Sequence, residues 1–106
     1  MFYLNRVILA GKIASGPEVR YTQRGRTVVF FTLTMPSPPG LREIGGRELE
    51  VEVMALGEAG ERWAKGVKEG SNVFVEGGLF ERKWEDEVGG HKEIGVIAQR
   101  ISLITG

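Results

Sequence analysis

Short stretches in which apolar and polar side chains alternate strictly limit what this chain can fold into. Residues 27–35 read TVVFFTLTM, and their apolar residues at every second position share one face: Val29, Phe31, Leu33 and Met35. Phe30 falls on the opposite face, among threonines that favour solvent. Residues 47–56 alternate in the same way, with Leu49, Val51, Val53 and Ala55 on the inner face and Glu50, Glu52, Met54 and Leu56 on the outer one. Because strand side chains point alternately to opposite faces, both stretches predict strands with one buried face.

Three further stretches of β-branched and apolar residues, each containing glycine, predict strands at 4–14, 71–84 and 93–104. In the second of these, Val73, Val75 and Leu79 share one side, and Phe80, Arg82 and Trp84 share the other. The residues SGPE at 15–18 indicate a turn, and QRGR indicates the tip of a hairpin over 18–35. Residues 36–46 hold three of the four prolines, which predicts a mobile loop.

Residues 57–70 form the helical candidate. Ala59, Trp63 and Val67 recur at a spacing of four, which places them on one stripe of a helix. Trp63 is therefore expected in the core, and Gly70 is expected just past the end of the helix.

Five strands with glycines inside them, in a chain of 106 residues, predict an all-β sheet curled on itself within a single domain over residues 1–106. A helix between the third and fourth strands is the wiring of a five-stranded OB-fold barrel, which is the fold class we expect. A small sandwich or an SH3-like barrel fits the same pattern of strands.

Composition argues against most catalytic and membrane functions. The chain has no cysteine, one histidine (His91, expected in a solvated loop) and one aspartate (Asp86), and it lacks the motifs of nucleotide hydrolysis or nucleophilic catalysis. We therefore expect no enzyme activity, no metal and no cofactor. No apolar run is long enough to span a bilayer and no signal peptide is recognisable, so we expect a cytoplasmic protein.

Charge is divided unevenly along the chain although the net charge is zero. Residues 1–47 carry seven basic and two acidic residues, and residues 48–106 carry seven basic and twelve acidic residues. The division indicates one basic surface, although solvated faces that happen to differ would give the same count.

Trp84 lies in a run of charged residues, within GLFERKWEDEVGG at 78–90. A large ring among Arg82, Lys83 and the following acids is poorly suited to a core. An exposed ring beside cations suits a nucleobase, which stacks on the ring while the cations hold phosphates. The alternative is a tryptophan at a hairpin tip that folds back on its own strand.

The sequence resembles the bacterial single-stranded DNA-binding protein family of homotetrameric OB-fold proteins. The resemblance is carried by NRVILAGKIASGPEVRYT at 5–22, FTLT at 31–34, KEGSNVFVEGGL at 68–79 and RKWED at 82–86. It implies an OB fold, a subunit interface that uses the first strand, and single-stranded DNA wrapped over the barrel. It also implies that Trp84 stacks on bases and that basic positions around it contact phosphates.

The resemblance and the strand pattern together give a candidate nucleic-acid-binding set. The stacking residues are Trp84, Phe80 and Phe30, and Tyr21 lies beside Arg20 in the family's VRY motif. The candidate phosphate contacts are Arg6, Lys12, Arg20, Arg82 and Lys83, with Arg24, Arg26 and Lys92 as secondary cations on loops. Lys12 is included because it follows Gly11 on the first strand, in the basic half.

The sequence departs from the family on the third strand and at the end of the chain. Glu50 and Leu56 stand where the family places aromatic residues that face DNA, and Glu52 stands where a base would serve better. The family's flexible segment and acidic tail do not follow SLITG, because the end was trimmed or because the protein is a tail-less relative. Replication or repair proteins are expected as possible partners, except, if the end is natural, those that dock on such a tail.

Two functions fit these observations. The first is a homo-oligomeric protein, a tetramer in preference to a dimer, that binds and protects single-stranded DNA with little sequence preference in replication, recombination and repair. The alternative is a tail-less assembly factor similar to primosomal replication protein N, which would act in replication restart and bind single strands more weakly. The sequence does not distinguish DNA from RNA.

Overall fold

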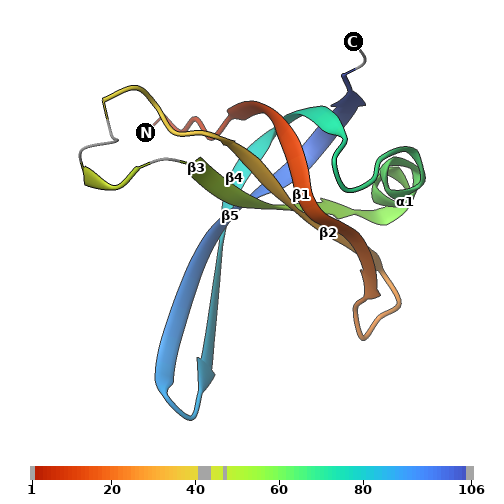
Figure 1. Cartoon of the computed structure of the whole chain (residues 1–106). Coiled ribbons are helices and arrows are strands. Elements are labelled where there is room, and N and C mark those ends of the chain that lie inside the picture. The colour runs from red at the N-terminus through yellow and green to blue at the C-terminus, as the bar shows by residue number, and fades with distance from the viewer. Residues whose placement is uncertain (1, 41–43, 47, 105–106) are drawn as a thin grey trace.

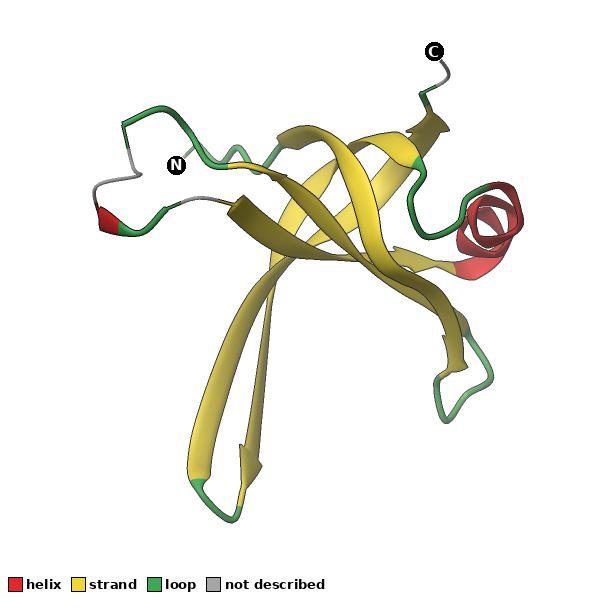
Figure 2. Cartoon of the chain, in the orientation of Figure 1, coloured by secondary structure: helices red, strands yellow, loops and turns green. Residues whose placement is uncertain are grey.

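The computed structural model describes residues 2–40, 44–46 and 48–104. It contains five strands and one helix: β1 (Val7–Tyr21), β2 (Thr27–Pro36), β3 (Glu48–Leu56), α1 (Gly57–Gly66), β4 (Asn72–Asp86) and β5 (Gly89–Leu103). The strands form a single curled sheet with α1 at one side, as Figures 1 and 2 show. The expected OB-fold architecture, with a helix between the third and fourth strands, is confirmed.

The sheet closes into a barrel in the strand order β1-β2-β3-β5-β4. All neighbouring strands are antiparallel except β3 and β5, which pair in parallel at Val53↔Val96 and Met54↔Ile97. β1 closes the barrel by pairing with β2 through its second half and with β4 through its first half. Each strand therefore supplies one face to the interior and one to the outside.

The interior is filled by β-branched and aliphatic side chains from every strand. The alternation predicted for β2 and β3 is confirmed at Val29, Phe31, Leu33, Val53 and Ala55, which are all at most 3% exposed. Trp63 is partly buried and packs against this core, as expected. Thr27, at the start of β2, donates a hydrogen bond of 2.6 Å to Glu61 of α1, which fixes the helix to the barrel.

Two local predictions of where an element ends are wrong. Residues 15–18 are not a turn between strands: β1 runs through them and absorbs the irregularity as register shifts between Ile13 and Glu18. The helix ends at Gly66 and not near Gly70, since Val67 already has an extended backbone. The turn at 23–26 is confirmed, with the N–H of Gly25 donating to the carbonyl of Thr22.

The β4–β5 hairpin is longer than the sequence indicated. Both strands have 15 residues and pair from Val73↔Leu103 to Asp86↔Gly89, so the hairpin projects from the barrel as a two-stranded ribbon (Figure 1). Leu79 has the same strand parity as Val75 but is 50% exposed, and the ribbon beyond it is exposed for most of its length. Part of the loop predicted at 36–46, residues 41–43, and position 47 of the third strand lie outside the described residues.

β4 and β5 lie very close together at Gly77, whose register partner is Ala98. A Cβ added at Gly77 would collide with the carbonyl oxygen of Ile97 in β5. The register between the two strands shifts at this point, between Glu76 and Gly77. The site therefore requires glycine for space, since it lies between two backbones and not beside a side chain that could move.

Gly77→Ala is expected to lower the free energy of unfolding by at least about 2 kcal/mol, because the backbone of β5 must move to accept a methyl group. Gly66→Ala is the matched control: no atom lies within 4 Å of its added Cβ, at the last helical position. That variant should be neutral or gain up to about 1 kcal/mol. Urea denaturation of both variants checks this, and equal stabilities would contradict the close approach.

Candidate nucleic-acid interface

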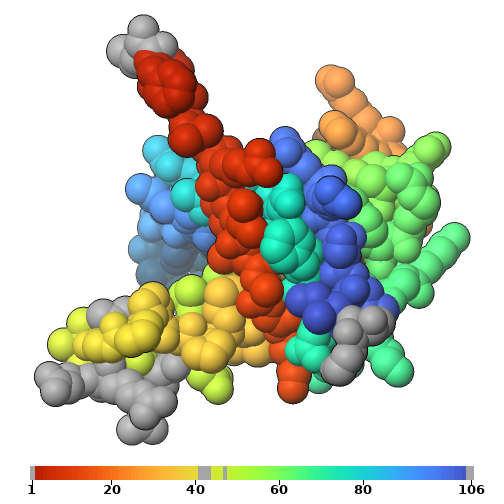
Figure 3. Space-filling view, turned by 90° about the horizontal axis from the view of Figure 1, so that it is seen from above, coloured from red at the N-terminus to blue at the C-terminus, as the bar shows by residue number. Residues whose placement is uncertain are grey.

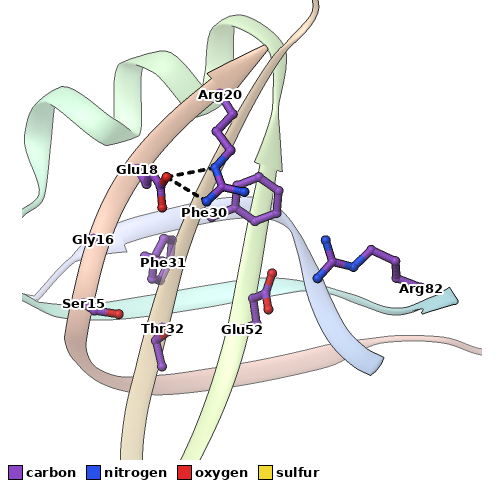
Figure 4. Close-up of a pocket in the computed structure, with 9 residues that line it drawn as sticks. All are labelled: Ser15, Gly16, Glu18, Arg20, Phe30, Phe31, Thr32, Glu52 and Arg82. Atoms are coloured by element: carbon purple, nitrogen blue, oxygen red, sulfur yellow. Dashed lines mark hydrogen bonds and ion pairs between the residues drawn. The ribbon is translucent and has the colours of Figure 1, made fainter. Parts of the chain in front are cut away.

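A groove of about 340 Å³ crosses the outside of the barrel over β1, β2 and β3 and reaches the base of the hairpin. We call it the central groove. It is lined by Ser15, Gly16, Glu18, Arg20, Phe30, Phe31, Thr32, Glu52 and Arg82. Figure 4 shows these side chains, with the ring of Phe30 near the centre and Arg20 and Arg82 on either side of it. The groove therefore brings together three of the predicted site residues.

Phe30 forms an aromatic surface within the central groove. It is half-buried, and the pairing of β1 with β2 places it opposite Glu18. The guanidinium carbon of Arg20 lies 5.5 Å from the centre of its ring, and Arg20 Nη2 is 2.8 Å from Glu18 Oε1. Arg20 is thus held over the ring by an exposed ion pair, which contributes about 0–1 kcal/mol and is easily exchanged.

Glu52, Glu93 and Arg82 form a charged cluster at the other side of the central groove. Arg82 Nη2 is 2.7 Å from Glu93 Oε2, and Glu93 also hydrogen-bonds to Glu52. The pKa of Glu52 is raised, first by that hydrogen bond and then by burial and the charge of Glu93. The pKa of Glu93 is lowered, first by the same hydrogen bond and then by Arg82.

Trp84 lies on the ribbon against two neighbours on the same face. Its ring stacks on that of His91, the residue opposite it on β5, with centroids 5.2 Å apart and an angle of 19° between the planes. The guanidinium carbon of Arg82 lies 5.0 Å from the centre of the indole. Trp84 remains 41% exposed. The sequence suggested a ring free of neighbours, but the indole is part of a stack of three residues. We call this stack, formed by Arg82, Trp84 and His91, the hairpin platform.

Asp86 holds His91 in this arrangement. Its Oδ2 lies 2.7 Å from His91 Nε2, and its Oδ1 accepts hydrogen bonds from the backbone N–H groups of Val88 and Gly89. The contact with His91, followed by these backbone bonds, lowers the pKa of Asp86. The carboxylate therefore connects the turn of the hairpin to the ring that supports Trp84.

The other predicted site residues are spread over several surfaces. Lys83 lies on the opposite face of the ribbon from Arg82 and Trp84, where it contacts Glu81 at 3.4 Å. Phe80 is half-buried, and its ring lies over Gly95, where an added Cβ would be 2.9 Å from Phe80 Cε1. Tyr21 is 69% exposed at the end of β1. The remaining two are Arg6, paired with Glu76, and Lys12, which lies on β1.

The structure does not gather the predicted cations into one basic surface. Four of them have carboxylate partners within 4.0 Å: Arg6, Arg20, Arg82 and Lys83. Sequence reasoning also missed three groups that shape the site. His91 was expected in a solvated loop but lies in β5 against Trp84, and Glu18 and Glu93 hold Arg20 and Arg82. One signal in the sequence could have placed His91 in a strand: the pattern of alternating side chains continues on both sides of the glycines at 89–90.

No group of His, Asp or Glu side chains in residues 2–40, 44–46 and 48–104 is arranged to hold a metal ion. None of the helices in that part of the chain is long and apolar enough to cross a bilayer.

The family model described as the single-strand binding protein family matches residues 4–104. The chain belongs to this family. The match covers all five strands, the central groove and the hairpin platform. The resemblance inferred from the sequence is confirmed.

Curated relatives carry the name single-stranded DNA-binding protein. A protein of Thermus thermophilus is 40% identical over 88 residues, which is 79% of this chain and 33% of that protein. The Thermus aquaticus protein is 32% identical over 107 residues, 97% of this chain and 40% of that protein. The Aquifex aeolicus protein is 32% identical over 105 residues, 95% of this chain and 70% of that protein. The chain thus spans less than half the length of the two Thermus relatives.

Glu52→Gln tests the charged cluster through the pH dependence of stability. The pKa of Glu52 is raised in the folded protein, so protonated Glu52 stabilises the fold. This contribution to the free energy of unfolding is fully present below pH 4.5 and is lost as the pH rises through the raised pKa. A glutamine amide still donates to Glu93 and does not ionise. The variant should therefore gain up to about 1 kcal/mol of unfolding free energy at neutral pH, a modest value because Glu52 is only partly buried.

The same variant should gain nothing well below pH 4.5, where Glu52 is protonated in the parent protein. Chemical denaturation at the two pH values measures the difference. An equal gain at both would show that Glu52 and Glu93 do not share a proton.

Proposed function

We propose that this protein binds single-stranded DNA without catalysis, through one nucleic-acid-binding domain whose track runs from the central groove onto the hairpin platform. The observation that carries the proposal is the position of Arg82. It lines the groove that contains Phe30, and its guanidinium also lies 5.0 Å from the ring of Trp84. Two aromatic surfaces are thus joined by one cation, which suits alternating bases and phosphates along a strand.

The ion pairs of the interface do not prevent phosphate binding. Arg20, Arg82 and Lys83 are each paired with a carboxylate, but their side chains are 62%, 49% and 75% exposed. An exposed pair of this kind is worth about 0–1 kcal/mol, so a phosphate can replace the carboxylate at small cost. Each new phosphate contact releases counterions from the DNA, and the affinity should therefore fall as salt rises.

The roles that follow are those of a single-stranded DNA-binding protein. Relatives of this chain from Thermus and Aquifex bear that name. By the same reasoning we place the protein in the cytoplasm, where it would cover single strands exposed during replication, recombination and repair. Stacking and phosphate contacts tolerate any sequence, so most of the track should show little preference among bases.

Trp84→Ala should weaken binding to oligo(dT) by roughly 1–3 kcal/mol, the usual loss when one stacked base loses its aromatic partner. The measurement is a fluorescence titration in a Trp63→Phe background, which leaves Trp84 as the one tryptophan. In that background, oligo(dT) should quench the emission of Trp84, and the affinity should drop steeply between low and high salt.

Phe2→Ala is the matched control, because Phe2 is an exposed ring outside the groove lining, the platform and the candidate binding set. It should bind oligo(dT) within about twofold of the parent protein, since exposed residues outside a contact have small effects. Unchanged emission of Trp84 on saturation with oligo(dT) would contradict the proposed track.

We also propose that the protein is a homo-oligomer, a tetramer in preference to a dimer. Figure 3 shows β1, β4 and β5 side by side on one face of the molecule. On that outer face, Ile8 is 54% exposed, Ala10 is exposed, and the half-buried Phe74 pairs with Ala10. Apolar side chains grouped on a sheet face favour association with a second copy.

Ile8→Asp should dissociate the oligomer, because it places an unpaired charge on the apolar face that a second copy would cover. Light scattering should report a mass that falls to that of one chain, 11.7 kDa. Val19→Asp is the control, since Val19 is 43% exposed on the part of β1 that pairs with β2. A parent protein that is monomeric at all concentrations would refute the assembly.

The alternative function, an assembly factor with weaker single-strand binding, is favoured by one observation. Three carboxylates stand in or beside the central groove, those of Glu18, Glu52 and Glu93, and they offset the charge of Arg20 and Arg82. The titrations above separate the two functions, because an assembly factor would bind oligo(dT) weakly and be indifferent to Trp84→Ala.

A further inference from the structure

We propose that the central groove reads the edge of a base stacked on Phe30, and that Glu52 makes this one position prefer guanine. The proposal rests on the proposed binding of single-stranded DNA and adds a specificity-determining residue to it. The rest of the track would remain indifferent to sequence.

The charges of the central groove suit a base better than a phosphate. Its lining includes two carboxylates, Glu18 and Glu52, and two guanidinium groups, Arg20 and Arg82. A phosphate placed among them would be repelled by the carboxylates, whereas the edge of a base is neutral and carries both donors and acceptors. The volume of about 340 Å³ lies within the range of roughly 300–1,000 Å³ for small-molecule sites.

Phe30 offers the stacking surface for that base. Arg20 lies over its ring at 5.5 Å but is held there by one exposed ion pair with Glu18. A base can therefore take the place of the guanidinium on the ring, and Arg20 is then free to contact the neighbouring phosphate.

Glu52 is the carboxylate in position to meet the edge of this base. It pairs with Thr32 across β2 and β3, so it stands diagonally to Phe30 on the same outer face of the sheet. Diagonal neighbours on a sheet are about 7–8 Å apart, a span that a glutamate side chain and a stacked base can close. Figure 4 shows its carboxylate below the ring of Phe30 and beside the guanidinium of Arg82.

Glu52 also lacks a cationic partner, unlike the other two acids. Glu18 is paired with Arg20 and Glu93 with Arg82, whereas no ion pair is found for Glu52 among the residues that the structure describes. Its neighbour is Glu93, another acid, and this crowding of two carboxylates raises the pKa of Glu52, first through their hydrogen bond and then through burial. A ligand that brings hydrogen-bond donors would relieve it.

Guanine is the base whose edge supplies those donors. Its N1–H and N2–H₂ groups are adjacent and match the two oxygens of a carboxylate. Adenine and cytosine each present one amino group beside an acceptor nitrogen, and thymine presents its N–H between two carbonyl oxygens that a carboxylate would repel. Hydrogen bonding to such edges is how proteins discriminate unpaired bases.

Competition between four oligonucleotides of one length tests the proposal. One is oligo(dT), and the others carry guanine, inosine or adenine at regular intervals in a thymine background, spaced to prevent guanine quartets. Inosine keeps N1–H but lacks the N2 amino group. The parent protein should bind the guanine oligonucleotide at least about fivefold more tightly than the inosine one, the lower end for a bidentate contact.

Glu52→Gln should bring the guanine-to-inosine ratio close to one, because an amide cannot accept both hydrogens. Glu50→Gln is the matched control: Glu50 is exposed two residues earlier on β3, on the same face but outside the groove, and its loss changes the net charge equally. The control should keep the ratio of the parent protein. A mere loss of negative charge would raise the affinity for all four oligonucleotides alike in both variants.

A parent ratio of guanine to inosine within about twofold, or a ratio that Glu52→Gln leaves intact, would overturn the inference while binding of oligo(dT) upheld the proposed function. If the protein bound none of the four oligonucleotides at low salt, the proposed function would fall and the inference with it.

Discussion

The close approach of β4 and β5 at Gly77 is the constraint on which the interface depends. The carbonyl oxygen of Ile97 occupies the space where any other residue at 77 would place its Cβ, and the register between the strands shifts there. On one side of this point, β4 also pairs with β1 and closes the barrel. On the other side, β4 and β5 extend as the ribbon that carries Arg82 and Trp84. The tight contact thus lies where β4 stops pairing with β1 and the strands begin their course toward the exposed ribbon.

The interface is balanced in charge and not simply basic. Arg20, Arg82 and Lys83 each have a carboxylate near them, and Asp86 lies beside His91. Such pairs hold long side chains in defined places while contributing little to stability. In the function that we propose, a phosphate of the DNA would replace the carboxylate beside each of these cations, so the site would be ordered before binding. The proposed affinity for single-stranded DNA should therefore depend on each acid in the groove. Glu52 differs from Glu18 and Glu93 because its hydrogen-bond partner is another acid, Glu93.

Much of the fold could be predicted from local alternation, because each strand buries one face. Val29, Phe31, Leu33, Val53 and Ala55 were placed correctly for this reason. The bulged course of β1 could not be predicted, since Gly16 and Pro17 in SGPE are equally compatible with a turn. For Phe30, Arg82 and Trp84, alternation predicted the strand face on which each side chain lies, and their part in binding belongs to the proposed function. The ion pairs of the site and the stack of His91 on Trp84 depend on how two strands are aligned with each other. The alternation within one strand carries no information on that alignment.

The central claim is that one strand of DNA passes from Phe30 to Trp84 with Arg82 between them. Photocrosslinking with an oligonucleotide in which bromodeoxyuridine replaces thymidine tests it most directly, because an adduct forms only where a base touches the protein. Mass spectrometry of the digested complex should find adducts on peptides that contain Trp84 and Phe30. Adducts confined to other surfaces, such as the outer face of β1 at Ile8, would contradict the account.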